Sequence, residues 1–204
     1  MKVITIVGVR ESGKTTIVEQ LTRELIRRGY RVGTIKSIFC PGFHMDSDRK
    51  NTGRHRKAGA GIVTARAGGE TAILFSEPLK TSDLLRHYEG YDWVLCEGDY
   101  EIPAPRIVAG KEEQDTLERL NPLTLAVSGV IAGRELTAFR GIPVIHPVED
   151  AESLVNLLET RVSDVEDLTS LDMPLKGEDI ALSRDWCRTG CRGHRKKESA
   201  EPEY

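Results

Sequence analysis

A glycine-containing stretch close to the N-terminus constrains the fold more than any other part of the sequence. Apolar, largely β-branched residues at 3–7 predict a buried strand, and Gly8 is followed after four residues by Gly13, Lys14 and Thr15. This is the G-x-x-x-x-G-K-[ST] pattern of a phosphate-binding loop, in which glycine lets backbone N–H groups point at phosphate oxygens. Apolar residues at helical spacing come next. Strand, loop and helix together predict a nucleotide site.

Each residue type in this loop has a role in binding phosphate. Lys14 supplies a positive charge near the outer phosphates, and the same charge would stabilise phosphoryl oxygens during hydrolysis. The Thr15 hydroxyl can bind Mg²⁺. The positive end of the following helix also attracts anions. An ordinary strand–helix turn is the alternative, but it gives no reason for these two residues. The residues expected to hold the nucleotide phosphates here are Gly8, Glu11, Ser12, Gly13, Lys14, Thr15 and Thr16.

Strand and helix patterns alternate along the chain, which predicts an α/β protein with a three-layer P-loop NTPase fold and a mostly parallel central sheet. Two of the strands flank a Gly-Gly turn and predict a hairpin. Residues 1–160 are expected to form the nucleotide-binding domain, and 161–204 a short C-terminal appendage. The expected strands are 3–7, 30–36, 62–65, 71–75, 91–97, 106–109, 123–129 and 142–147, and the longer helices are 15–28, 112–120 and 150–160.

An acidic residue follows one of the most apolar predicted strands. The strand at 91–97 ends at Glu97, which is followed by Gly98 and Asp99. Ligands of parallel α/β sheets bind at the carboxyl ends of strands, so Glu97 is placed to hold Mg²⁺ or to orient a water molecule. A simple loop carboxylate is the alternative, although a phosphate loop needs an acidic partner of this kind. Asp92, at the other end of the strand, is expected to be structural.

The segment at 37–57 has no regular pattern, and it carries two carboxylates and a basic run. Long irregular segments are uncommon and are often functional. A solvated surface loop is the alternative interpretation for any single residue in it. As a group, these residues favour a segment that faces the nucleotide or a substrate. The candidate binding residues in it are Asp46, Asp48, Lys50, Arg54 and Arg56.

Near the C-terminus, Cys187, Cys191 and His194 follow a Cys-x3-Cys-x2-His spacing. These three side chains are candidate ligands for Zn²⁺, iron or an iron–sulfur cluster. The segment itself lacks a fourth ligand. Cys40 or a second subunit are possible sources of one, and the alternative is that the thiols bind no metal.

Composition excludes several other classes of protein. The formal net charge is −3 and aromatic residues are 5% of the chain, so neither a basic field nor stacking residues argue for binding nucleic acid. No apolar run approaches the length of a membrane span. A strand pattern begins after two residues, which does not fit a signal peptide. We therefore expect a cytoplasmic protein that binds neither nucleic acid nor membranes.

Several motifs in order resemble the family of molybdopterin-guanine dinucleotide biosynthesis protein B, a group of P-loop GTP-binding proteins. The similarity covers about residues 1–160. The Thr-Ile-Lys strand at 34–36 followed by the Arg-x-Arg-x-Ala-Gly-Ala run at 54–60 is its most particular part. The other motifs are the phosphate loop at 8–16, the His-x-Asp-x-Asp run at 44–48, the Leu-Cys-Glu-Gly run at 95–98 and the Ile-Pro-Val-Ile-His-Pro run at 142–147.

This resemblance implies a weakly hydrolysing GTP-binding protein, usually a homodimer, that assists the enzyme attaching GMP to molybdopterin in molybdenum or tungsten cofactor synthesis. It also implies that the loop residues bind phosphates and Mg²⁺, that Glu97 is the family's acidic residue, and that the polar segment at 46–56 lies near the nucleotide. The chain has no Asn-Lys-x-Asp motif, so GTP in place of ATP follows from the resemblance alone.

Two other functions fit the same motifs. A metal-delivery GTPase would carry its metal at Cys187, Cys191 and His194. A small-molecule kinase would use the same loop and bind its acceptor with Arg54 and Arg56, but no lid or carboxylate base is evident for it.

Overall fold

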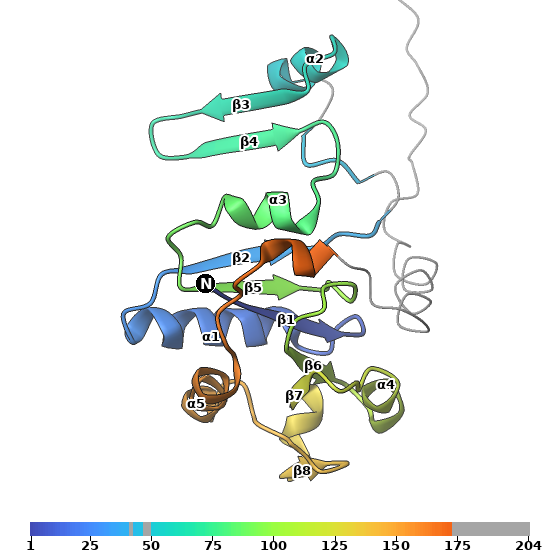
Figure 1. Ribbon diagram of the computed structural model, residues 1–204. Helices are drawn as coiled ribbons and strands as arrows, with labels where there is room; N and C mark the ends of the chain where they lie inside the picture. Colours follow the sequence, from blue (N-terminus) through green and yellow to red (C-terminus); the bar gives the residue numbers. More distant parts are fainter. Residues whose placement is uncertain (41–42, 47–49, 173–204) are drawn as a thin grey trace, which may run out of the picture.

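The computed structural model describes residues 1–40, 43–46 and 50–172, and its centre is a five-stranded sheet (Figure 1). All neighbouring strands in this sheet are parallel, in the order β2-β5-β1-β6-β7. The predicted α/β fold with a mostly parallel sheet is therefore confirmed. The five strands are β1 (Lys2–Gly8), β2 (Val32–Lys36), β5 (Trp93–Glu97), β6 (Arg106–Gly110) and β7 (Thr124–Gly129).

Side chains alternate across β1 and bury both faces of the sheet. Ile4 and Ile6 pack with apolar residues of two helices, whereas Val3 and Val7 enter clusters on the opposite face. A strand covered on both faces needs a continuous apolar run, which is the pattern that residues 3–7 show.

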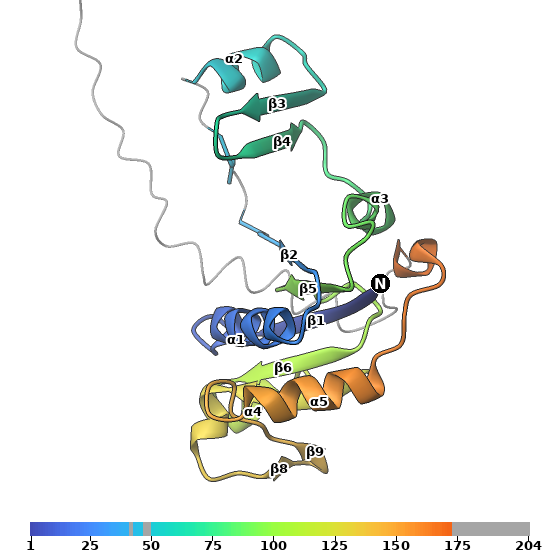
Figure 2. The ribbon, with the colours of Figure 1, turned by 90° about the vertical axis from the view of Figure 1, so that its left-hand side faces the viewer.

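Helices cover the two faces and give three layers (Figure 2). One face carries α1 (Lys14–Arg27) and α5 (Ala151–Arg161), whose buried leucines and valines share a core with β1 and β5. The other face carries α3 (Thr81–Arg86) and the 3-10 helix η2 (Leu168–Asp172). Across the described residues, no helix is long and apolar enough to cross a membrane.

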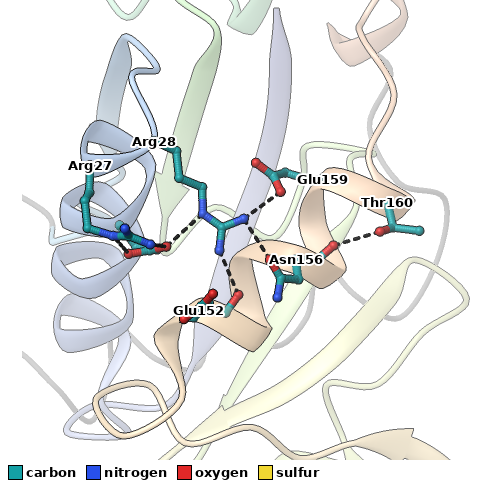
Figure 3. A network of polar contacts seen from close by, with 7 residues as sticks. Arg27, Arg28, Glu152, Asn156, Glu159 and Thr160 are labelled. Atoms are coloured by element: carbon teal, nitrogen blue, oxygen red, sulfur yellow. Dashed lines mark hydrogen bonds and ion pairs between the residues drawn. The ribbon is translucent and has the colours of Figure 1, made fainter.

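A polar network ties the end of α1 to α5 (Figure 3). The Arg28 guanidinium donates to Glu24 on its own helix at 2.8 Å and to Glu159 on α5 at 2.6 Å, and it also contacts Asn156. Hydrogen bonds from Arg27 and Arg28 lower the pKa of Glu24 to about 2. The network fixes how the first helix after the phosphate loop sits against the last long helix.

The predicted hairpin forms, but it lies outside the central sheet. β3 (Ile62–Arg66) and β4 (Thr71–Phe75) pair antiparallel as a separate sheet, and α2 (Asn51–Lys57) packs beside them. We call residues 51–75 the arm. Both ribbon views show it standing away from the central sheet, with α2 on its far side (Figures 1 and 2).

The last predicted strand is shorter than expected. Only β9 (Ile142–Pro143) is formed, paired with β8 (Ala138–Phe139), and Val144 makes a single parallel bridge to Val127 of β7. Pro143 has no N–H to donate, and it interrupts what would otherwise be a sixth sheet strand. Two shorter helical elements, α4 (Glu113–Leu117) and the 3-10 helix η1 (Val130–Gly133), follow β6 and β7.

Packing continues beyond residue 160. Val162 joins the core beside α5, and Leu171 of η2 packs with Leu85 of α3 on the opposite face. The expected division of the chain into 1–160 and 161–204 stays a prediction, since most of the second range lies outside the described residues.

Candidate nucleotide-binding site

The turn between β1 and α1 has a backbone that requires glycine. A Cβ on Gly8 would lie 2.3 Å from the carbonyl oxygen of Ala109, so no larger residue fits. Gly13 has φ +96°, in the left-handed region that glycine adopts without strain. The Ser12 hydroxyl donates to Val9 O at 2.9 Å, and Val130 N donates to Ser12 O. These bonds hold the turn against the carboxyl end of β7.

Lys14 folds back over this turn. Its Nζ donates to Gly8 O at 3.0 Å and to Val9 O at 2.6 Å. Burial lowers the pKa of Lys14, and the nearby charge of Glu97 opposes that shift. The ammonium group therefore lies over the loop at which phosphate oxygens are expected to bind. In this structure it donates to carbonyl oxygens of the loop.

Glu97 lies beside the loop because β5 sits next to β1. In the sheet register it is level with Ile6 of β1 and with Lys36 of β2. Its Oε1 accepts hydrogen bonds from the Thr15 hydroxyl at 2.9 Å and from Lys36 Nζ at 2.9 Å. The tertiary structure thus brings together two residues, 15 and 97, that the sequence analysis assigned to one site.

These two residues fit Mg²⁺. A hydroxyl and a carboxylate are the hard oxygen ligands that this ion prefers, and in nucleotide sites the remaining positions go to phosphates and water. Within the described ranges, no group of three or more His, Cys, Asp or Glu side chains gathers as a metal site. A site that a nucleotide must complete is therefore a better fit than a cage made of protein ligands alone.

The loop after β5 is attached to the phosphate loop by Tyr100. Its hydroxyl accepts from Gly8 N at 3.0 Å and donates to Gly8 O at 2.8 Å, and the side chain is buried. Asp99 accepts from the Ser37 hydroxyl at 2.9 Å. Sequence reasoning missed Tyr100, because no motif marks a tyrosine that contacts a distant turn.

Lys36 was also missed, although one signal pointed to it. It ends a predicted strand of the same parallel sheet, and the carboxyl ends of such strands meet at one edge. Arg119, after α4, has a side chain that is 9% exposed, and its charge is a further cause of the lowered Lys14 pKa. The site therefore contains more positive charge than the motifs alone indicated.

Glu11 and Thr16, the other predicted loop residues, lie at the edge of the site. Glu11 has φ 61°, and its exposed carboxylate lies 3.7 Å from Lys111 Nζ. Thr16 is in the first turn of α1, next to Thr15. Their roles toward phosphate stay predictions.

The predicted polar segment is assembled differently from the loop. Asp46 accepts a short hydrogen bond from the Thr52 hydroxyl and lies 4.0 Å from Lys50 Nζ, so it contacts the start of α2. Arg54 and Arg56 are on α2 in the arm. Asp48 lies outside the described residues. That this segment binds the nucleotide stays a prediction, and the ribbon views place α2 away from the central sheet (Figures 1 and 2).

The predicted metal ligands Cys187, Cys191 and His194 lie outside the described residues. Cys40, considered above as a fourth ligand, is disulfide-bonded, so it does not offer a free thiolate. Cys96 is a free thiol in the core, and burial raises its pKa to about 12.

A family model matches most of the chain. The family described as "Molybdopterin guanine dinucleotide synthesis protein B" (MobB) matches residues 3–131. A "Probable molybdopterin-guanine dinucleotide biosynthesis adapter protein" of Bacillus subtilis is 28% identical over 150 residues, covering 71% of this chain and 84% of the relative. The corresponding adapter protein of Haemophilus influenzae is 31% identical over 128 residues, covering 60% of this chain and 71% of the relative.

Solved structures agree with the fold. The crystal structure of Bacillus subtilis MobB has a TM-score of 0.61 at 22% identity and covers 81% of this chain and 100% of that one. A MobB homologue from Bacillus stearothermophilus has a TM-score of 0.58 at 26% identity and covers 78% of this chain and 99% of that one.

Proposed function

Because the chain belongs to the family of molybdopterin guanine dinucleotide synthesis protein B, we propose that it is a GTP-binding adapter in molybdenum or tungsten cofactor synthesis. In this role it assists a guanylyltransferase-type partner that attaches GMP to molybdopterin. Family membership supports the pathway, and the loop geometry supports the nucleotide.

One observation carries the nucleotide part of the proposal. The Thr15 hydroxyl and the Glu97 carboxylate are hydrogen-bonded at 2.9 Å although 82 residues separate them. They meet in the first turn of α1, beside a turn in which Gly8 has no room for a side chain, and the charge of Glu97 acts on Lys14. A metal-binding hydroxyl, an acidic partner and a phosphate-binding lysine are the parts that nucleoside triphosphate sites share.

Slow hydrolysis of GTP follows from the same residues. A water oxygen bonds to the γ-phosphorus, the bond from that phosphorus to the bridging oxygen breaks, and GDP and phosphate are released. Lys14 and the loop N–H groups stabilise the charge on the phosphoryl oxygens. Thr15 and Glu97 would hold Mg²⁺, which supplies further positive charge to the phosphates when it is bound. Orienting the attacking water is a second role that we propose for Glu97.

A homodimer is the second part of the proposal, and the arm supports it. Ile62 and Ile73 are 59% and 50% exposed. In the hairpin register Ile73 is opposite Thr64, which is two residues from Ile62, so both isoleucines lie on one face. A second copy would remove this apolar face from water.

Titration calorimetry with GTP and with ATP, with and without Mg²⁺, tests the proposal. The expected result is binding of GTP in preference to ATP, with affinity that depends on Mg²⁺. Preference for ATP would contradict the adapter role and favour the kinase alternative. Binding of neither nucleotide would contradict the nucleotide site itself.

A further inference from the structure

Lys36 closes the Thr-Ile-Lys run noted in the sequence, but no role in the site has been assigned to it above. It ends β2, level with Glu97 in the register of the sheet, and its Nζ donates to Glu97 Oε1 at 2.9 Å. The Lys36 side chain is 59% exposed, whereas that of Glu97 is 10% exposed. The carboxylate is thus fixed by the surrounding fold, and the lysine is the partner with freedom to move.

The same carboxylate oxygen serves two donors. Oε1 of Glu97 also accepts from the Thr15 hydroxyl at 2.9 Å. Nζ of Lys36 and the Thr15 hydroxyl are therefore separated by no more than the sum of these two hydrogen bonds. Lys14 approaches from the loop, and the charge of Lys36 is among the causes that lower the Lys14 pKa. Two ammonium groups therefore act on one another across the end of the loop.

We propose that Lys36 is a second lysine for the terminal phosphate of the bound nucleotide, held by Glu97 until a triphosphate arrives. It thereby lets the protein distinguish GTP from GDP. This inference rests on the proposed function, because it presupposes a nucleotide in the loop.

The competition for Glu97 Oε1 supports this role. A divalent ion held by Thr15 and Glu97 would draw on the oxygen that Lys36 now occupies. When bound, this ion would supply positive charge to the outer phosphates, and the terminal phosphate would then be near Glu97 and Lys36. Lysine is a mobile point charge with three donors, which suits transfer from a carboxylate to a neighbouring phosphate. A diphosphate lacks the outermost group, and Lys36 then has only Glu97 to bind.

A purely structural role is the alternative. If Lys36 only positions Glu97, its removal alters the site in the same way for any nucleotide, and the affinities for GTP and GDP change by the same factor. The ratio of the two affinities therefore separates the roles.

The test measures affinities for GDP and for a non-hydrolysable imido analogue of GTP, both with Mg²⁺, in wild-type protein and in Lys36→Met. Loss of one charge-assisted hydrogen bond to phosphate predicts a fall of about tenfold or more for the GTP analogue and less than about threefold for GDP. Lys36→Arg, which keeps the charge, should recover part of the loss. Lys2→Met is the matched control, because Lys2 lies over the Trp93 ring at the opposite end of the strands.

Three outcomes overturn the inference. Equal losses for both nucleotides assign Lys36 to positioning Glu97 alone, and no loss for either removes it from the site. If wild-type protein binds neither guanine nucleotide, the proposed function fails and the inference fails with it. Lys36→Gln, which keeps a donor for Glu97, repeats the comparison if the methionine variant does not fold.

Discussion

The two strands that carry the nucleotide site and the two strands of the arm differ in what they bury. Nearly every residue of β1 and all of β5 are buried, whereas β4 has no fully buried residue and β3 has one, Val63. Buried strands fix the positions of their carboxyl ends, and with them the residues that we propose contact phosphate. An exposed hairpin fixes nothing by itself but leaves an apolar face for another molecule. In the proposed function, the buried strands serve nucleotide binding and the exposed hairpin serves dimer formation.

The largest expected effect is on the nucleotide site. Lys14→Ala removes the ammonium group that lies over the loop, and binding of GTP should become undetectable by calorimetry. Loss of the phosphate-binding lysine leaves the charge of the outer phosphates uncompensated. Tight binding by this variant would reject the assignment of the loop. Thermal unfolding of the variant checks that the fold is intact.

Glu97→Gln should separate binding from hydrolysis. The amide is isosteric and still accepts the hydrogen bond from Thr15, so GTP binding is retained. The negative charge that helps to hold Mg²⁺ or orient water is lost, and the hydrolysis rate should fall about 100-fold. A phosphate-release assay measures the rate. Unchanged turnover would give Glu97 a structural role only.

The arm should show the opposite behaviour. Ile62→Asp combined with Ile73→Asp places two charges on the apolar face, and sedimentation velocity should show a shift from dimer to monomer. GTP affinity should change by less than about threefold, because distant sites act independently. Glu70→Gln, in the hairpin turn, is the matched control and should leave the assembly unchanged. A monomeric wild-type protein would contradict the role of the arm.

The pH dependence of GTP binding should report the protonation of Lys14, whose side chain is half-buried. Its pKa is lowered from 10.5 in the folded protein, and phosphate beside it favours the charged form. GTP binding should therefore take up a proton and weaken as pH rises through the lowered pKa toward about 10.5. Calorimetry in two buffers with different ionisation enthalpies measures the proton uptake. Binding of GTP without proton uptake across this pH range would contradict the assignment.

The lowered pKa of Lys14 also predicts how the free energy of unfolding changes with pH. A lysine with a lowered pKa binds fewer protons in the folded than in the unfolded protein between the two pKa values. Its contribution to the free energy of unfolding therefore increases as pH rises through that window. Nucleotide-free protein should show this increase more strongly than the Lys14→Met variant.

The smallest effect is expected between the two long helices. Arg28→Ala breaks the network that joins α1 to α5 and should lower the thermal midpoint by about 2–4 °C without changing GTP affinity. Arg86→Ala breaks an exposed pair with Asp83 on a single helix and should have a smaller effect. An equal effect of both would contradict a role of the network in joining the helices.

Acid should remove the difference between wild type and Arg28→Ala. The pKa of Glu24 is lowered to about 2 by its two arginines, so its stabilising contribution is present above its ordinary pKa of 4.5. That contribution is lost as pH falls from 4.5 toward 2, because protonation ends the ion pairs. Thermal unfolding measured across this range tests the assignment.

Local sequence patterns predicted those parts of the candidate site that are formed by residues close together in the sequence or by the end of a predicted strand. The spacing from Gly8 to Thr15 fixed the loop, since its function depends on consecutive backbone groups. Glu97 was found from its place at the end of an apolar strand, because parallel strands align such ends. No signal along the chain marks Tyr100, and Lys36 is marked only by its place at the end of a predicted strand.

The arm shows the same limit on a larger scale. Alternating residues about a Gly-Gly turn predicted a hairpin, and the hairpin is formed. Its separation from the central sheet depends on which strands pair with each other, and a short alternating run does not specify its pairing partner. The strand expected at 142–147 was too long for a related reason: Pro143 limited the pairing available to it.

The sequence by itself determined the α/β class, the glycine-containing turn that we propose binds phosphate, and the order of the strands along the chain, because apolar periodicity and glycine spacing are local properties. Only the tertiary structure decided that β5 lies between β1 and β2. That placement lets Thr15 and Lys36 donate hydrogen bonds to the same carboxylate oxygen of Glu97. Hydrogen bonds between distant residues depend on strand neighbours, and strand neighbours are set by how the whole core packs.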